Sequence, residues 1–149
     1  QISSAGEVTM PLQPMVIAKN SGNIVNVTGD GTVYTCLFDD EITDQGGDWS
    51  SPTFTAPVTG TYLVTPMISA FGILSSTNSW STVVVTSNRS HSGRLQDCWA
   101  QQVSGSFGET ISVFADMDAS DTLTVTLKVS NGAAVVDYAS NSELGIVLL

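Results

Sequence analysis

The chain has 149 residues, of which 42% are hydrophobic and only 12% are charged, and its formal net charge is −10. This length and composition indicate one globular domain that can bury a sizeable core. Four Lys and Arg residues stand against fourteen Asp and Glu residues, so the chain lacks the basic surface needed to bind nucleic acid or an anionic membrane. No apolar run reaches the length that crosses a bilayer.

Residues 1–9 are small and polar, and we expect them to form a lead-in outside a single domain over residues 10–149. They lack the basic start and apolar centre of a signal peptide, which leaves open secretion of a chain from which a signal has been removed. The rest of the chain has no long helical pattern, whereas runs with a period of two are frequent.

Strands are predicted where alternating or apolar runs end in turn residues. The runs cover residues 14–18, 31–42, 61–73, 80–88, 109–118, 121–132, 134–140 and 143–149. Pro66 predicts a bulge or an edge position for its strand, because proline cannot donate to a sheet. About eight to ten such strands predict an all-β, antiparallel, two-sheet sandwich or jelly roll.

Two features near the C-terminus predict further details of the strand arrangement. Apolar side chains alternate with threonine and lysine in residues 121–132, and Asn131-Gly132 predicts a hairpin that returns along residues 134–140. Residues 143–149 are apolar on both faces, so we expect this strand to be covered on both sides, within the core or by another subunit.

The sequence contains no specific pattern of catalytic residues that would indicate an enzyme. His91 is the single histidine, and a triad built from it, a serine and Asp97 is not a specific signal in a serine-rich chain. Cys36 and Cys98 do not have the spacing of a metal site. We expect both to be free thiols, with one disulfide between them as the alternative.

Carboxylates cluster between residues 30 and 48, where Asp44 and Asp48 are the best candidates for a calcium site. The alternative is a solvated loop whose charge prevents pairing with other sheets. No other cofactor is expected. Trp80 and Trp99 lie beside small polar residues, and the sequence leaves open whether they contact a ligand or cover the core.

Residues 54–62, FTAPVTGTY, resemble the signature of the trimeric jelly-roll superfamily that includes the complement globular heads and tumour necrosis factor. The signature residues are Phe54, Pro57, Gly60 and Tyr62. In that family they mark the passage between two consecutive core strands. The resemblance extends over residues 10–149. It implies a homotrimer with the last strand near the three-fold axis, a calcium ion in some members, and an inward-packed aromatic at Trp49.

A narrower resemblance is to jelly-roll domains of bacteriophage virion proteins. It rests on the segments VTMPLQP (8–14), NVTGDGTVYT (26–35), DQGGDW (44–49), VVVTSNRS (83–90) and ADMDASDTLTVTLKVSNG (115–132). In such proteins the segment before the domain continues a fibre or stalk, so residues 1–9 are expected to be a stalk remnant.

These resemblances imply a protein on the virion surface, at the tip of a tail fibre or spike, that binds a host polysaccharide or protein receptor. Its partners would be its own copies, other virion proteins and the host receptor. The alternatives are a capsid decoration or head-fibre protein, a secreted complement-like or cytokine-like ligand, and an enzyme acting on capsule polysaccharide. The candidate receptor-binding residues are Trp80, Asn88, Arg89, His91, Arg94 and Trp99.

Overall fold

A computed structural model describes residues 10, 12–96 and 105–149. The described residues form fourteen β-strands and no helix, and hence no helix that could cross a membrane. The strands are β1 (Met15–Lys19), β2 (Ile24–Thr28), β3 (Asp30–Thr35), β4 (Asp40–Gln45), β5 (Trp49–Ser50), β6 (Thr53–Thr55), β7 (Gly60–Ile73), β8 (Ser79–Thr86), β9 (Ser90–Gln96), β10 (Gly105–Thr110), β11 (Val113–Met117), β12 (Thr122–Ser130), β13 (Val136–Tyr138) and β14 (Glu143–Leu148).

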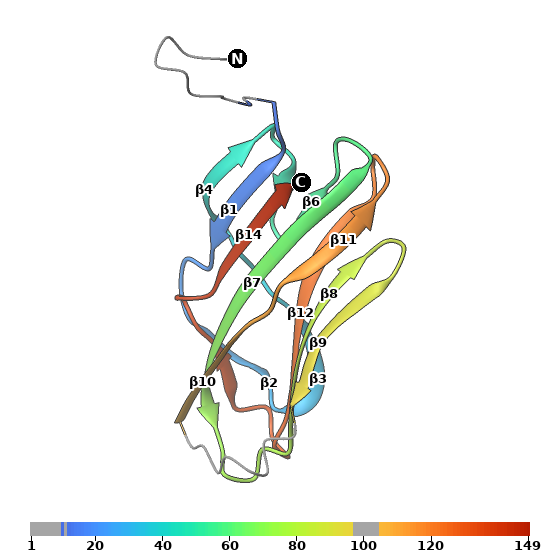
Figure 1. The fold of residues 1–149 in the computed structure, drawn as a ribbon. Coiled ribbons are helices and arrows are strands. Elements are labelled where there is room, and N and C mark those ends of the chain that lie inside the picture. The colour runs from blue at the N-terminus through green and yellow to red at the C-terminus, as the bar shows by residue number, and fades with distance from the viewer. Residues whose placement is uncertain (1–9, 11, 97–104) are drawn as a thin grey trace.

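Two antiparallel sheets pack face to face (Figure 1). The larger sheet has the order β2-β13-β7-β14-β1-β4, with β10 and β11 on the other edge of β7, and the smaller sheet has the order β5-β6-β12-β8-β9. β3 runs beside β12, where the Cys36 N–H donates to the Val125 carbonyl at 2.8 Å. The predicted two-sheet jelly roll is confirmed, with more and shorter strands than expected.

The signature segment joins the two sheets. β6 lies in the smaller sheet and β7 in the larger one, so residues 54–62 make the chain cross the core. Phe54 and Tyr62 are fully buried and their rings pack edge to face, with centroids 5.4 Å apart. The Tyr62 hydroxyl donates to the Val58 carbonyl at 2.7 Å, which fixes the corner between the strands. The passage between two core strands is therefore confirmed.

The single strand predicted over residues 31–42 is wrong, because the structure divides it into β3 and β4. Between them, Cys36 and Phe38 are fully buried, and the chain passes from the smaller sheet to the edge of the larger one. Burial raises the pKa of the Cys36 thiol, which is free. Cys98 lies outside the described residues. The strand predicted over residues 109–118 is similarly divided into β10 and β11, both paired with β7.

The hairpin predicted at Asn131-Gly132 is also wrong. A turn does form there, since the Ala133 N–H donates to the Asn131 side-chain oxygen at 3.1 Å. However, β13 does not return along β12; it pairs with β2 and β7 in the other sheet. Crossing to that sheet leaves Val136 and Tyr138 with no exposed surface, a burial that favours this pairing.

Pro66 lies inside the larger sheet, so the expectation of an edge strand is wrong. β7 pairs with β14 on one side and with β10 and β11 on the other. The Pro66 carbonyl accepts a hydrogen bond from the Ile111 N–H at 3.2 Å, in the break between β10 and β11. The nitrogen of a strand residue points to the same side as its carbonyl, so the missing donor faces this break and costs no ladder hydrogen bond.

The corner aromatic should contribute strongly to stability. Replacing Phe54 by Ala leaves a cavity in the core and is expected to lower the free energy of unfolding by about 3–5 kcal/mol. The matched control Val58→Ala, at an exposed position of the same corner, should cost less than about 0.5 kcal/mol. Urea denaturation at one fixed protein concentration measures both, and equal losses would contradict this role for Phe54.

Candidate functional site

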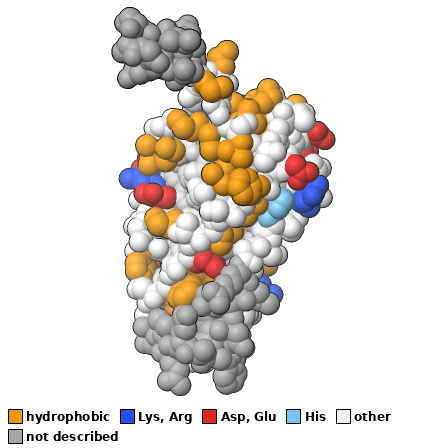
Figure 2. All heavy atoms as spheres, in the orientation of Figure 1, with side chains coloured by type: hydrophobic (Ala, Val, Ile, Leu, Met, Phe, Trp, Pro, Cys, Tyr) orange, Lys and Arg blue, Asp and Glu red, His pale blue; other side chains and the backbone are white. Residues whose placement is uncertain are grey.

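The outer face of the larger sheet carries an apolar row. Side chains alternate between the core and this face along each strand. The strand register places four apolar residues directly opposite one another across β1, β14, β7 and β11, and these are Met15, Val147, Leu63 and Phe114. Figure 2 shows hydrophobic side chains gathered on this face. We call the four residues Met15, Val147, Leu63 and Phe114 the apolar row.

Three residues of the apolar row also line a groove on the same face. It has a volume of about 190 Å³ and is lined by Met15, Val16, Ile17, Leu63, Thr65, Gly145, Ile146 and Val147. Gly145 faces Thr65 across the strand pair, and the Thr65 side chain lies close to the place that a Gly145 side chain would occupy. A Cβ atom at Gly145 would lie 2.8 Å from the Thr65 Oγ1. No charged side chain lines the groove, so it suits an apolar group.

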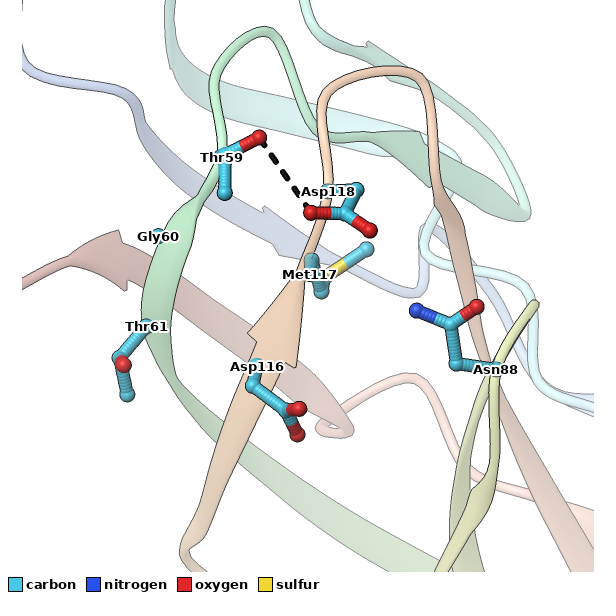
Figure 3. A pocket seen from close by; sticks show the side chains of 7 residues that line it. All are labelled: Thr59, Gly60, Thr61, Asn88, Asp116, Met117 and Asp118. Atoms are coloured by element: carbon cyan, nitrogen blue, oxygen red, sulfur yellow. Dashed lines mark hydrogen bonds between the residues drawn. The ribbon is translucent and has the colours of Figure 1, made fainter.

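Three turns meet around a polar hollow at one end of the sandwich, shown in Figure 3. The turns join β6 to β7, β8 to β9, and β11 to β12. The hollow has a volume of about 270 Å³, and its lining is Thr59, Gly60, Thr61, Asn88, Asp116, Met117 and Asp118. Most of these side chains end in oxygen or nitrogen atoms, so the hollow can exchange hydrogen bonds with a polar ligand.

Asp121 holds two of these turns together. Its carboxylate accepts hydrogen bonds from the Asp118 N–H at 2.8 Å, the Ser87 hydroxyl at 2.8 Å and the Asn88 amide. The Asp118 N–H and then the Ser87 hydroxyl, as the leading causes, hold the pKa of Asp121 below its usual value. The network fixes Asn88 at the hollow near neutral pH, where Asp121 is ionised.

The structure places the predicted receptor-binding residue Asn88 in the lining of this hollow, and Arg89 is the next residue along the chain. Asn88 and Arg89 are exposed in the turn between β8 and β9. The Arg89 guanidinium pairs with Asp116 of β11 at 2.8 Å. His91 of β9 is half-buried, and its Nε2 atom has no hydrogen-bond partner among the described residues. The side chain of Arg94, and Trp99 and Asp97 altogether, lie outside the described residues.

The structure does not support Trp80 as a receptor-binding residue. Its side chain has no exposed surface, so direct contact with a receptor is excluded. Its indole N–H donates to the Glu109 carboxylate at 2.9 Å and to the Thr82 hydroxyl at 3.1 Å, and its ring packs on Phe107. Trp49, by contrast, is buried as expected. Its indole N–H donates to the Phe38 carbonyl at 3.2 Å.

Asp44 and Asp48 share one turn at the other side of the larger sheet. The Asp44 carboxylate accepts hydrogen bonds from the backbone N–H groups of Asp48 and Trp49, both at 3.0 Å. The Asp48 carboxylate folds over Gly46, where a Cβ atom would lie 2.5 Å from it. Burial, and then the charge of Asp44, raise the pKa of Asp48. Among the described residues, no three His, Cys, Asp or Glu side chains come together as metal ligands.

The ionised Asp48 should therefore cost stability. Because its pKa is raised in the folded state, folding favours the protonated form, and stability improves as the pH falls through that pKa. Asp48→Asn is expected to raise the melting temperature at pH 7 in the presence of a chelator. The difference from the unaltered protein should close toward about pH 3, where Asp48 is protonated in both states.

The calcium prediction can be tested with the same pair of proteins. A cation held by Asp44 and Asp48 should raise the melting temperature of the unaltered protein but not that of Asp48→Asn. An unchanged melting temperature on addition of calcium would contradict a site here.

Sequence reasoning did not predict the apolar row, and it predicted only Asn88 among the receptor-binding candidates that line the hollow. Leu63 and Val147 stand out only as apolar residues on both faces of their strands, and Phe114 lies in a mixed run. Thr59, Asp116 and Asp118 have no local pattern that sets them apart. A search for strands whose two faces are both apolar could have found the row, but not its register.

The described chain is all-β and forms two sheets, and it contains the signature segment FTAPVTGTY. This architecture is a jelly roll. No protein-family model matches it, and no curated protein does. Among solved structures, the globular domain of zebrafish complement 1qA protein is similar with a TM-score of 0.62 and 13% identity, over 91% of this chain and 97% of that one. Murine APRIL at pH 8.5 is similar with a TM-score of 0.63 and 14% identity, over 92% and 99%.

A second structure of murine APRIL, at pH 5.0, gives a TM-score of 0.57 at 14% identity, over 92% of this chain and 99% of that one. Likenesses at such low identity define the fold alone. The protein therefore has the complement-head and tumour necrosis factor-like jelly-roll fold over nearly all of its length.

Proposed function

We propose that the protein is a binding protein that assembles as a homotrimer and contacts a surface receptor through the end of the sandwich that holds Asn88 and Arg89. The observation that carries the proposal is the apolar row with its groove on the outer face of the larger sheet. No charged side chain lines the groove, and Lys19, Glu143 and Asp116 lie elsewhere on the same face. A face of this kind on a protein of net charge −10 is the surface expected of a subunit interface.

The dimensions of the face show how much of a subunit interface it can supply. The row crosses four neighbouring strands, and with β4 the face is five strands wide. At about 4.8 Å between strands and 3.4 Å per residue, it measures roughly 20 Å by 20 Å. Its flat area is therefore about 400 Å², half of the roughly 800 Å² that each partner buries in a standard interface, so each contact must also include the strand edges and turns around the face.

We place the receptor contact at the end of the sandwich where polar and charged side chains are exposed. Asn88, Arg89 and the hollow lie on turns, where side chains can vary without disturbing the sheets. Three copies would present three such ends, and weak contacts at each would add through multivalency. A binding function agrees better than a catalytic one with His91, which is the single histidine of the sequence and is half-buried.

Two settings suit this function. The fold of the complement domain and of murine APRIL favours an extracellular, secreted ligand. The sequence segments similar to bacteriophage virion domains favour the tip of a tail fibre or spike, with capsid decoration as the structural alternative. The gene segment that encodes the residues before Gln1 separates these settings, because a fibre, a capsid-binding arm and a signal peptide differ plainly in sequence.

The assembly has a direct test. Sedimentation equilibrium at micromolar concentration should give three times the 15.6 kDa of one chain. Ile17→Asp puts a charge at the groove and should dissociate the trimer, whereas Val33→Asp, at an exposed position of β3 outside this face, should not. A monomeric mass for the unaltered protein would defeat the proposal.

Receptor binding needs its own measurement. Fluorescently labelled trimer is applied to an array of immobilised glycans and to intact bacterial and animal cells. Where it binds, Arg89→Ala is expected to weaken binding at least about tenfold, while Lys128→Ala, on the smaller sheet, leaves it unchanged. Because exposed ion pairs add little stability, Arg89→Ala should stay trimeric. Absence of binding to every surface would contradict the receptor role.

A further inference from the structure

Phe114 ends the apolar row on β11 and is 65% exposed. Single exposed hydrophobic side chains are ordinary, but this one stands on the same face as the groove and directly opposite Leu63. Its neighbour along the strand on that face is Asp116, which is neutralised by Arg89 at 2.8 Å. The ring therefore projects on the same face as a groove that no charged side chain lines.

The groove is the apolar depression described on the same face. Its floor of Gly145 and Thr65 lies below the side chains of Met15, Ile17 and Leu63 that line it, and its volume is about 190 Å³. An aromatic ring is flat and apolar and could lie on this floor without displacing a charged group. Filling it would remove from water both the ring and the apolar walls.

Phe114 does not line the groove of its own subunit. β11 and β14 lie on opposite sides of β7, so β11 is one strand spacing, about 5 Å, from the strand of Thr65 and two spacings, about 10 Å, from the strand of Gly145. A projecting group and a receptive groove at different places on one surface can meet between copies either reciprocally about a two-fold axis or in a head-to-tail contact, which is the kind that a homotrimer requires. Such contacts close into a ring when the rotation between copies allows it.

We propose that Phe114 of each subunit packs into the groove above Gly145 and Thr65 of the next subunit. The contact rests on the homotrimer of the proposed function and assigns the residues that join its subunits. It accounts for both exposed features with one interaction, and it places the Arg89–Asp116 ion pair at the rim of the interface, where polar groups are tolerated.

A photo-crosslinking residue at position 114 tests the contact directly. Phe114 is replaced by the aromatic photo-crosslinker p-benzoylphenylalanine, which keeps a ring at this position. Subunits labelled with ¹⁵N and unlabelled subunits are mixed, irradiated and digested, so that links between copies are distinguished by mass from links within one chain. Links between copies are expected to fall on residues 15–17, 63–65 or 145–147. Links between copies at other residues alone would overturn the proposal.

Substitutions give a second, independent measure. Phe114→Ala is expected to raise the concentration at which half of the trimer dissociates at least about tenfold, as for a central aromatic of an interface. Val33→Ala, another exposed hydrophobic residue, is the control and should leave that concentration unchanged. Circular dichroism confirms folding of each variant.

The two proposals fail in different ways. If the unaltered protein is a monomer, the homotrimer itself is wrong. If it is a trimer whose dissociation is unaffected by Phe114→Ala, the trimer stands and the contact through Phe114 is overturned. A two-fold dimer with links from position 114 to the groove would keep the contact and overturn the trimer.

Discussion

The rest of the structure depends on the alternation of side chains along β7. This strand runs from Gly60 to Ile73 and pairs with β14 and β13 on one edge and with β10 and β11 on the other. Tyr62, Val64 and Ile68 point inward and are fully buried. Because the side-chain period is two, a shift of one residue would exchange the core face for the outer face. The core therefore fixes the register of the entire larger sheet.

The same constraint creates the candidate interface. When Tyr62 and Val64 face the core, Leu63 and Thr65 must face outward, and the paired strands add Val147, Gly145 and Phe114 to the same surface. Most acidic residues of the described chain lie on turns or edge strands, as at Asp48 and Asp121, and Glu143 stands at the first position of β14. Charge is thus kept away from the middle of the face, which can lose its water when subunits associate, while the polar turns stay free to meet a ligand.

Sequence reasoning succeeded where a feature is local. The FTAPVTGTY corner and the strands along β7 and β12 were predictable from residue type and period, and the inward packing of Trp49 was predictable from the family resemblance. It failed where distant packing decided the outcome. Asn131 and Gly132 form a turn, but burial of Tyr138 takes the chain to the other sheet. Trp80 has polar neighbours in sequence, yet its alternation along β8 points it into the core beside Thr82.

The sequence by itself determined an acidic, all-β sandwich with a marked crossing between its sheets, because composition, strand period and the proline–glycine corner act within a few residues. The tertiary structure alone decided which strand edges meet. Met15, Leu63, Phe114 and Val147 are scattered along the chain, and they form one row only because the register of four strands aligns them. Register between strands far apart in sequence is set by packing of the whole core, and no short segment carries it.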